Sequence, residues 1–514
     1  MDKVNYESKP SKPASKKVSQ STKNNKKTAK KLKPEHQKIR KTITLLIIIL
    51  ELFLIYALYT SNLGILLGVG IGILSLILSG IIITKVNNLS GNFGLYIYGG
   101  SSGISTIEKI SKFKREFWIF LSEWGLVMSF GVLSYFIFKG RVSKKAVFIG
   151  LISIAFIIVV MLPYFLLSFQ YIKIPNLPSI SMPQGVTGIS QLSLFGYILL
   201  LISLVGGFSI FLFIELLAAS GLMIANIFTV ASSIASSSPN YTALSTATPG
   251  LAPLIPGITI PFFAGILSLA VILIVHEFSH GILSGVYKIK IKKIGLALFG
   301  ILPIGAFVEP DEKAVVSSEK YVQNNIFIAG ISANFLLTFI FFIFVLLFLL
   351  YIIPNIYTNG LYISAVAQGS PAYNVIAPGS LIVAWNNMNV SNVSQLDIAA
   401  KSDLPSSIVT VKTNETTYKI RANSTGKIGV YIQEYERQKG GVTSSILVFL
   451  YQFLVLSLVL NFLVATINLL PIPLFDGWRI YKNTIKSERK LKLLVALVII
   501  MFVLLALPWL FISL

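Results

Sequence analysis

Cysteine is absent and histidine is scarce in this chain of 514 residues. Without cysteine, the protein has no disulfide, no iron–sulfur cluster and no thiolate zinc site. The only histidines are His36, His276 and His280, and the last two lie within an apolar segment. A histidine-ligated metal in the apolar part of the chain therefore has to use His276 and His280.

Charged residues are also scarce. They make up 12% of the chain, against about 25% in soluble domains, whereas 54% of the residues are hydrophobic. This composition predicts a polytopic α-helical membrane protein whose spans each need about 20 apolar residues. Apolar runs predict spans near 43–63, 64–84, 116–138, 146–168, one or two within 192–232, and further spans near 260–285, 321–353, 444–470 and 491–513.

The positive charge is concentrated at the N-terminus. Residues 1–42 contain fourteen of the 43 Lys and Arg residues, separated by Ser, Asn and Pro. We expect a disordered basic tail on the cytosolic side that contacts anionic lipid headgroups. Tyr6 is the one Phe, Trp or Tyr in this tail, so the tail lacks the repeated aromatic residues that would support nucleic-acid binding, and such binding is not expected.

The composition changes between residues 354 and 442, where polar residues and short β-like runs predict a small extramembrane β-rich domain. Two basic clusters, KIKIKK (288–293) and RIYKNTIKSERKLK (479–492), each follow a predicted span and favour the cytosol. The domain at 354–442 should therefore face outward. Its four glycosylation sequons, at Asn389, Asn392, Asn414 and Asn423, and a further one at Asn240, agree with this orientation.

The orientation of the N-terminal half is not settled by the same rule. About six spans are expected within 43–259, and the basic segments 1–42, 109–115 and 139–145 all favour the cytosolic side. A simple count of crossings does not place all three basic segments on one side.

The segment HEFSH (276–280) lies inside a predicted span. Residues four apart share one face of a helix, so both histidine side chains can bind one cation. Glu277 can then reach a water molecule on that cation, as in the H-E-x-x-H pattern of zinc hydrolases. The alternative is a pair of polar residues packed inside the helical bundle.

Two histidines leave a catalytic zinc ion one protein ligand short. With no further histidine in the apolar part of the chain, the third ligand has to be a carboxylate. Asp476 is favoured because Pro471 and Pro473 break the helix just before it, and irregular backbone at membrane depth is tolerated where it lines a buried site. The acidic residues in or beside the spans are Glu51, Glu123, Glu215, Glu309 and Asp476.

HEFSH together with NLLPIPLFDG (468–477) resembles the site-2 protease family of intramembrane zinc metalloproteases. The resemblance covers residues from about 260 to 514. It implies that His276, His280 and Asp476 bind one Zn²⁺ per chain and that Glu277 is the catalytic base. It also implies substrate-positioning roles for Asn468 and for Asn334 in IFIAGISANF (326–335).

The resemblance has departures and extensions. Ile331 stands where the family usually has proline, and Trp478 stands where it often has a second glycine. Residues 288–312 resemble the re-entrant β-hairpin that follows the catalytic helix of the family; the alternative is an amphipathic loop at the membrane face. Residues 366–390 resemble part of a PDZ domain; the alternative is a β-rich domain that only connects the spans.

The expected architecture therefore comprises a basic tail (1–42), N-terminal spans (43–259), two parts of a catalytic membrane core (260–353 and 443–514) and an inserted PDZ-like domain (354–442). The resemblance implies cleavage of transmembrane segments of membrane-anchored proteins. A secondary transporter and an inactive metal-binding scaffold remain as alternatives. The substrate, the activating signal and the oligomeric state stay undetermined.

Overall fold

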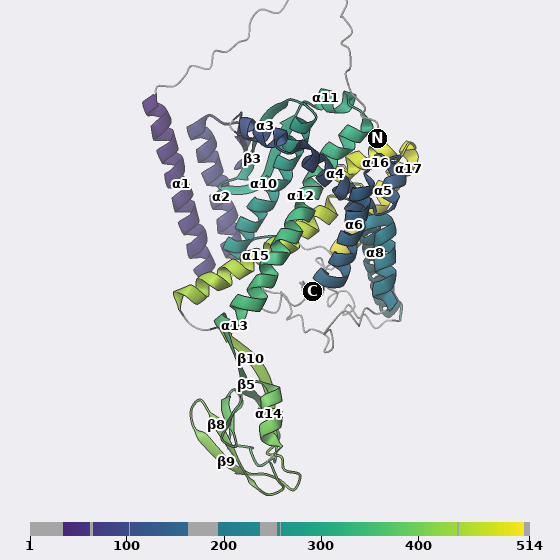
Figure 1. Ribbon diagram of the computed structural model, residues 1–514. Helices are drawn as coiled ribbons and strands as arrows, with labels where there is room; N and C mark the ends of the chain where they lie inside the picture. Colours follow the sequence, from purple (N-terminus) through teal and green to yellow (C-terminus); the bar gives the residue numbers. More distant parts are fainter. Residues whose placement is uncertain are drawn as a thin grey trace, which may run out of the picture.

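The computed structural model describes residues 34–61, 65–101, 103–162, 194–236, 254–257, 259–401, 403–438 and 441–507. Most of the predicted basic tail, the Asn240 sequon and the end of the last predicted span lie outside the described residues. The helices form one bundle, and a β-rich domain extends from one end of it (Figure 1).

The N-terminal half is mostly helical, and helix α1 already begins nine residues before the predicted first span. Its helices are α1 (Pro34–Thr60), α2 (Ile65–Asn87), α3 (Ile104–Lys112), α4 (Arg115–Phe130), α5 (Leu133–Ile137), α6 (Lys144–Phe156, continued by a π-helical turn, Ile157–Met161) and α8 (Leu194–Ala235). Non-helical backbone at Gly207 divides α8 into two helical parts.

The C-terminal half combines three long helices, α10, α12 and α15, with several short ones. Its helices are α10 (Phe262–Val286), α11 (Glu312–Ser317), α12 (Lys320–Leu347, continued by a π-helical turn, Phe348–Ile352), α13 (Ile353–Ile356), α14 (Val393–Ala400), α15 (Val442–Ile467), α16 (Asp476–Thr484) and α17 (Glu488–Ala506). Helices α10, α12 and α15 pack against one another, and α4 and α16 pack against α12.

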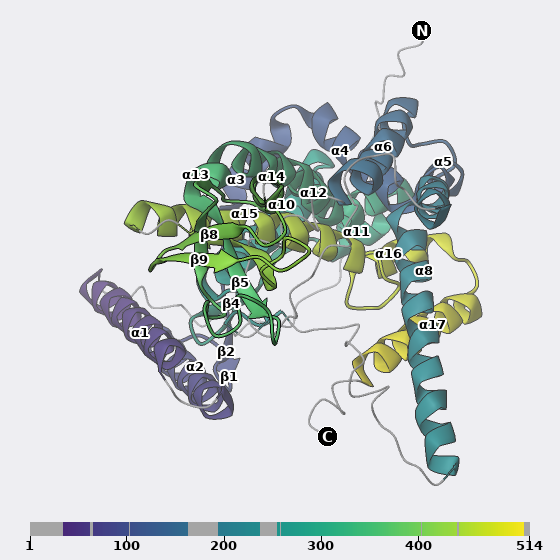
Figure 2. The same ribbon diagram turned by 90° about the horizontal axis from the view of Figure 1, so that it is seen from below.

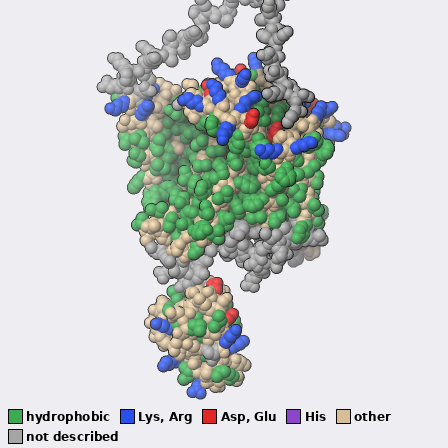
Figure 3. All heavy atoms as spheres, in the orientation of Figure 1, with side chains coloured by type: hydrophobic (Ala, Val, Ile, Leu, Met, Phe, Trp, Pro, Cys, Tyr) green, Lys and Arg blue, Asp and Glu red, His purple; other side chains and the backbone are tan. Residues whose placement is uncertain are grey.

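Seven helices in the described part of the chain are long and apolar enough to cross a membrane. Four of them lie in the N-terminal half, where about six spans were expected. On the face seen in Figure 3, hydrophobic side chains form a broad belt across the bundle, and Lys and Arg side chains gather at the end where α11 and α16 lie in Figure 1. The β-rich domain lies at the opposite end.

The predicted span at 116–138 does not form a single crossing. Helix α4 has 16 residues, about 24 Å in length, whereas a bilayer core is about 30 Å thick. Arg115, the first residue of α4, donates to the carbonyl of Val286 at the end of α10. Arg141, after α5, pairs with Glu319 at the start of α12. Both basic segments therefore lie at the same end of the bundle, which explains why counting crossings failed.

A four-stranded antiparallel sheet lies beside α10, with the order β1-β2-β3-β4. The hairpin of β3 (Ile291–Phe299) and β4 (Leu302–Pro310) occupies the segment in which a hairpin was expected. Two further strands that were not predicted, β1 (Gly91–Asn92) and β2 (Leu95–Gly100), extend the sheet from the N-terminal half. Strand β4 is thus the edge strand nearest α10.

The β-rich domain is built around a second sheet with the order β10-β5-β6-β8-β9, to which β7 adds beside β6. Its apolar core is formed by alternating residues of these strands and by one face of α14. In Figure 2, where the molecule is seen from below, this domain lies in front of α10, α12 and α15. The strands are β5 (Tyr357–Val366), β6 (Leu381–Trp385), β7 (Met388–Asn389), β8 (Ile408–Thr413), β9 (Thr417–Arg421) and β10 (Val430–Gln438).

Candidate metal centre

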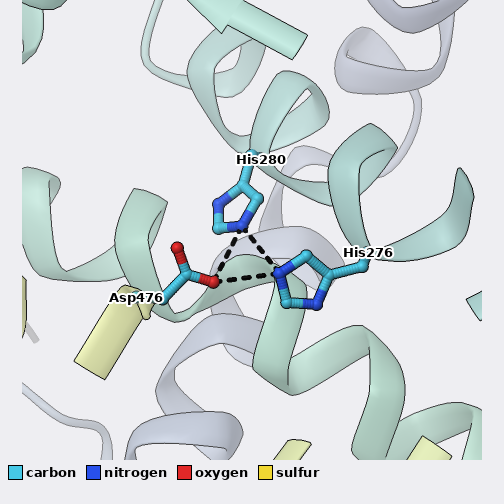
Figure 4. Close-up of side chains that lie close together, drawn as sticks. All are labelled: His276, His280 and Asp476. Carbon is cyan, nitrogen blue, oxygen red and sulfur yellow. Dashed lines mark hydrogen bonds and ion pairs between the residues drawn. The ribbon is translucent and has the colours of Figure 1, made fainter. Parts of the chain in front are cut away.

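Helix α10 presents His276 and His280 on the same face, and both imidazoles point toward Asp476 at the start of α16 (Figure 4). The two Nε2 atoms are 3.3 Å apart. Oδ2 of Asp476 lies 2.9 Å from Nε2 of His276 and 3.1 Å from Nε2 of His280. The two Nε2 atoms and Oδ2 thus form a small triangle of potential ligand atoms, although Asp476 lies 200 positions after His276 in the chain.

The loop between α15 and α16 positions Asp476. Asn468 ends α15, and its side chain donates to the carbonyl of Val464. The carbonyl of Asn468 accepts a hydrogen bond from the backbone N–H of Gly477 at 2.7 Å. A Cβ on Gly477 would lie 2.6 Å from the carbonyl of Leu469. Only glycine allows the start of α16 to approach the end of α15 this closely, which explains the glycine that follows Asp476.

A second set of contacts fixes the far end of α16. The Asn483 amide donates to Oδ1 of Asn324 at 2.9 Å and to Oε1 of Gln323 at 3.2 Å. The carbonyl of Asn483 accepts from Nζ of Lys320 at 2.9 Å. Since α16 has only nine residues, these bonds to the first turns of α12 also restrain Asp476 at its other end.

The second nitrogen of each imidazole has a polar neighbour. Nδ1 of His280 lies 2.7 Å from the carbonyl of Ile326, which can only accept a hydrogen bond. Nδ1 of His280 therefore carries the proton and Nε2 carries the lone pair that faces Asp476. This tautomer is the one that a metal-ligating Nε2 requires.

Nδ1 of His276 lies 3.1 Å from the side-chain amide of Asn334, which is fully buried. The atom at that distance is Nδ2, and Oδ1 of Asn334 is buried without a hydrogen-bond partner. Rotating the amide by 180° lets Oδ1 accept a hydrogen bond from the Nδ1–H of His276 and leaves Nε2 of His276 free to bind a cation. Asn334 therefore contacts a candidate ligand directly.

Gly330 of α12 forms the wall of the site behind the two imidazoles. A Cβ at this position would lie 2.5 Å from Nε2 of His276 and 2.6 Å from Nε2 of His280. Any side chain would therefore occupy the space next to both nitrogen atoms. The absence of a side chain at Gly330 leaves room for an ion between the histidines and Asp476.

The donor set fits zinc. Ligand bonds of about 2.0–2.1 Å at tetrahedral angles place two ligand atoms about 3.3 Å apart, close to the spacings of 2.9–3.3 Å seen here. Among the described residues, His276, His280 and Asp476 are the group identified as able to hold a metal ion.

Glu277 lies beside this group, on the side of the four-stranded sheet. Its Oε2 accepts a hydrogen bond from the backbone N–H of Val308 in β4 at 3.2 Å. Because this N–H points away from β3, the open edge of β4 faces Glu277. Among the described residues no further strand pairs with this edge of β4, so the structure places a carboxylate and a sheet edge next to the candidate ligands.

The other intramembrane acids have different surroundings. Glu51 accepts a hydrogen bond from Ser75 within the α1–α2 pair. Glu123 accepts from Tyr321 at 2.5 Å and from the backbone N–H of Ser143, and so ties α4 and the start of α6 to α12. Neither of them joins the histidines, in agreement with the choice of Asp476 as the third candidate ligand.

Comparison with known protein families identifies the part of the chain that carries this site. Residues 264–508 match the model of peptidase family M50, the family of site-2 proteases. These residues form a peptidase family M50 domain. The family is one of membrane metalloproteases, and together with the seven candidate spans this match makes the chain a multi-pass membrane protein.

An uncharacterized protein of Methanocaldococcus jannaschii is 28% identical to this chain over 244 residues. The matched segment covers 46% of this chain and 61% of the relative, so the chain spans less than two thirds of the relative's length.

The M50 domain contains His276, Glu277, His280, Asn334, Asn468 and Asp476. Sequence reasoning did not identify the parts played by Gly330, Ile326 and the edge strand β4. The run of small residues around Gly330 was a signal for close packing, but a carbonyl contact such as that of Ile326 has no signal in the sequence. Strand β2 did have a signal in the sequence, since the residues LYIY, which have high β propensity, precede two glycines.

Proposed function

We propose that this protein is an intramembrane zinc endopeptidase that cleaves transmembrane segments of membrane-anchored proteins. The observation that carries the proposal is the triangle of His276, His280 and Asp476, with Glu277 beside it. Zinc, when bound by these three residues, would polarise the scissile carbonyl and lower the pKa of a bound water molecule.

Glu277 is the general base of the proposed reaction. It takes a proton from the attacking water and passes it to the leaving amine. The N–H of Val308 holds its carboxylate in place, and His276 and His280 are oriented by Asn334 and by the carbonyl of Ile326. Asn334 is in this proposal a residue that positions a ligand and, through it, the substrate carbonyl.

The substrate has to be extended before it is cut, because a helical peptide bond is shielded by its own turns. The open edge of β4 supports pairing with an extended segment in the manner of strand addition. Asn468 is proposed to contact the substrate backbone from the other side of the site. The hairpin of β3 and β4 would enter the membrane from the cytosolic side, as a re-entrant element.

The orientation is part of the proposal. The end of the bundle that is rich in Lys and Arg faces the cytosol together with the mouth of the site. The domain at 354–442 faces outward and acts as a PDZ-like filter that binds extended peptides. This protein would then act in regulated intramembrane proteolysis.

The test uses the full-length protein in lipid nanodiscs with a panel of single-span substrate proteins. Glu277→Gln should abolish cleavage, whereas the matched variant Glu312→Gln, on the exposed helix α11, should cleave like the wild type. A zinc chelator should stop cleavage, and added Zn²⁺ should restore it.

Two results would contradict the proposal. Cleavage that persists in Glu277→Gln would remove the base from the mechanism. Solute uptake by the reconstituted protein, without cleavage of any substrate in the panel, would favour a transporter.

A further inference from the structure

A pocket of about 370 Å³ lies beside Glu277, between α10 and the four-stranded sheet. Ile274, Glu277 and Phe278 form its α10 side, because these positions share one helical face. The ends of β2 and β3 and the middle of β4 form its sheet side. The pocket therefore opens directly onto the proposed general base.

The floor of this pocket depends on two glycines. Gly99, Gly295 and Phe307 are paired across β2, β3 and β4 in one row. A Cβ on Gly99 would lie 3.1 Å from Cζ of Phe307, and a Cβ on Gly295 would lie 2.8 Å from its Cε1. The phenyl ring thus rests against two positions without side chains. Any side chain there would crowd the ring and narrow the pocket that both glycines line.

Strand β2 lies outside residues 264–508, so the M50 domain alone does not complete the pocket. Helix α2 packs closely against the β1–β2 turn, because a Cβ on Gly80 would lie 2.3 Å from the carbonyl of Gly94. It also fixes the β3–β4 turn, since a Cβ on Gly300 would lie 2.6 Å from the carbonyl of Leu76. The N-terminal helices therefore hold one wall of a pocket that belongs to the active site.

We propose that this pocket binds an apolar side chain of the substrate, of the size of Leu or Phe, next to the scissile bond. The proposal rests on the proposed function. Apart from Glu277 and Tyr98, the lining is apolar or glycine. The volume is at the lower end of the roughly 300–1,000 Å³ of ligand pockets, which suits one or two side chains rather than a helix.

The test varies the residues that flank the scissile bond of a cleaved single-span substrate through Ala, Leu, Phe and Trp. Wild-type protein should cut the Leu or Phe substrate about tenfold or more faster than the Ala substrate, the usual discrimination of an apolar pocket. Gly99→Ala should reduce this preference about threefold or more, because Gly99 lines the pocket and a methyl group there would take up pocket space and crowd the Phe307 ring at 3.1 Å. Phe307→Ala should enlarge the pocket and raise the relative rate for Trp.

A purely structural effect of Gly99→Ala would slow all substrates equally and leave the ratios unchanged. Gly221→Ala serves as the control, because a methyl group there meets nothing within 4 Å. Unchanged ratios in both Gly99→Ala and Phe307→Ala would overturn the pocket assignment, while loss of cleavage in Glu277→Gln would still support the proposed function.

A second measurement does not depend on turnover. A photoreactive leucine analogue placed at successive positions of the substrate is crosslinked to the Glu277→Gln protein, and the crosslinked peptides are sequenced. Crosslinks to residues 95–100 of β2 from the position that flanks the scissile bond are expected. Crosslinks from that position to other regions only would overturn the inference.

Discussion

The most direct test of the metal centre is a single added methyl group, Gly330→Ala. The new Cβ would lie 2.5 Å and 2.6 Å from the Nε2 atoms of His276 and His280. The optimal separation of such atoms is about 3.5 Å, so the methyl group is about 1 Å too close to both nitrogens. Relief requires both imidazoles, or α12 itself, to move by a large fraction of this distance.

Two different losses should follow from Gly330→Ala. Overpacking of this kind destabilises a fold by about 1–3 kcal/mol, which the surrounding bundle can tolerate. Zinc affinity should fall by about 100-fold or more, because loss of one orienting partner alone already costs about 10–100-fold. The variant should therefore remain folded, bind little zinc and lack peptidase activity.

The assay measures zinc per chain by elemental analysis after dialysis in detergent, together with the melting temperature. Gly221→Ala, a methyl group added in open space on α8, is the matched control and should retain zinc. A Gly330→Ala protein with one zinc per chain and wild-type affinity would refute the placement of the ion beside Gly330.

Four further outcomes are expected. Asn334→Leu should lower zinc affinity about 10–100-fold without unfolding the protein, because Nδ1 of His276 loses its partner. Asn334→Asp keeps an acceptor and should retain most of the zinc affinity. Equal zinc affinities of the Leu and Asp variants would contradict this. Asn483→Leu should reduce the free energy of zinc binding more than it reduces the free energy of unfolding of the zinc-free protein. Titration calorimetry measures the first quantity and thermal unfolding the second. Zinc at about 1,000 times its dissociation constant should stabilise the fold by about 4 kcal/mol relative to chelated protein, and the same melting temperature in both states would contradict this. Asp311 pairs with Lys292, and this hydrogen bond holds the pKa of Asp311 below its usual range, so Asp311→Asn should lower stability near neutral pH. The difference in stability between wild type and variant should vanish as pH falls through the folded-state pKa of Asp311. A difference in stability that is independent of pH would contradict this.

The local features of the site could be predicted from the sequence because they depend on short spacings. The helical period places His276 and His280 on one face whatever surrounds them. With three histidines in the chain and no cysteine, few residues were left to complete a zinc site, and the prolines before Asp476 marked a break near the membrane surface. The β3–β4 hairpin likewise had a clear period-two signal.

Features that depend on packing between distant segments were not predictable in this way. Strand β2 joins β3 from nearly two hundred residues earlier, and its six residues alone do not indicate a partner. The path of α4 was misjudged because hydropathy detects apolar composition. It does not detect a helix that ends after 16 residues with both flanking basic segments at the same end of the bundle.

The sequence by itself determined the candidates for the chemistry of this protein: three residues predicted to bind a metal and one carboxylate predicted to act as a base, in a multi-pass membrane protein. The tertiary structure decided how these groups are held. Gly330 leaves space for an ion, Ile326 and Asn334 set the imidazoles, and Gly99 opens a pocket beside Glu277. These contacts arise from helices and strands far apart in the chain, so their distances are set by close packing and not by residue spacing.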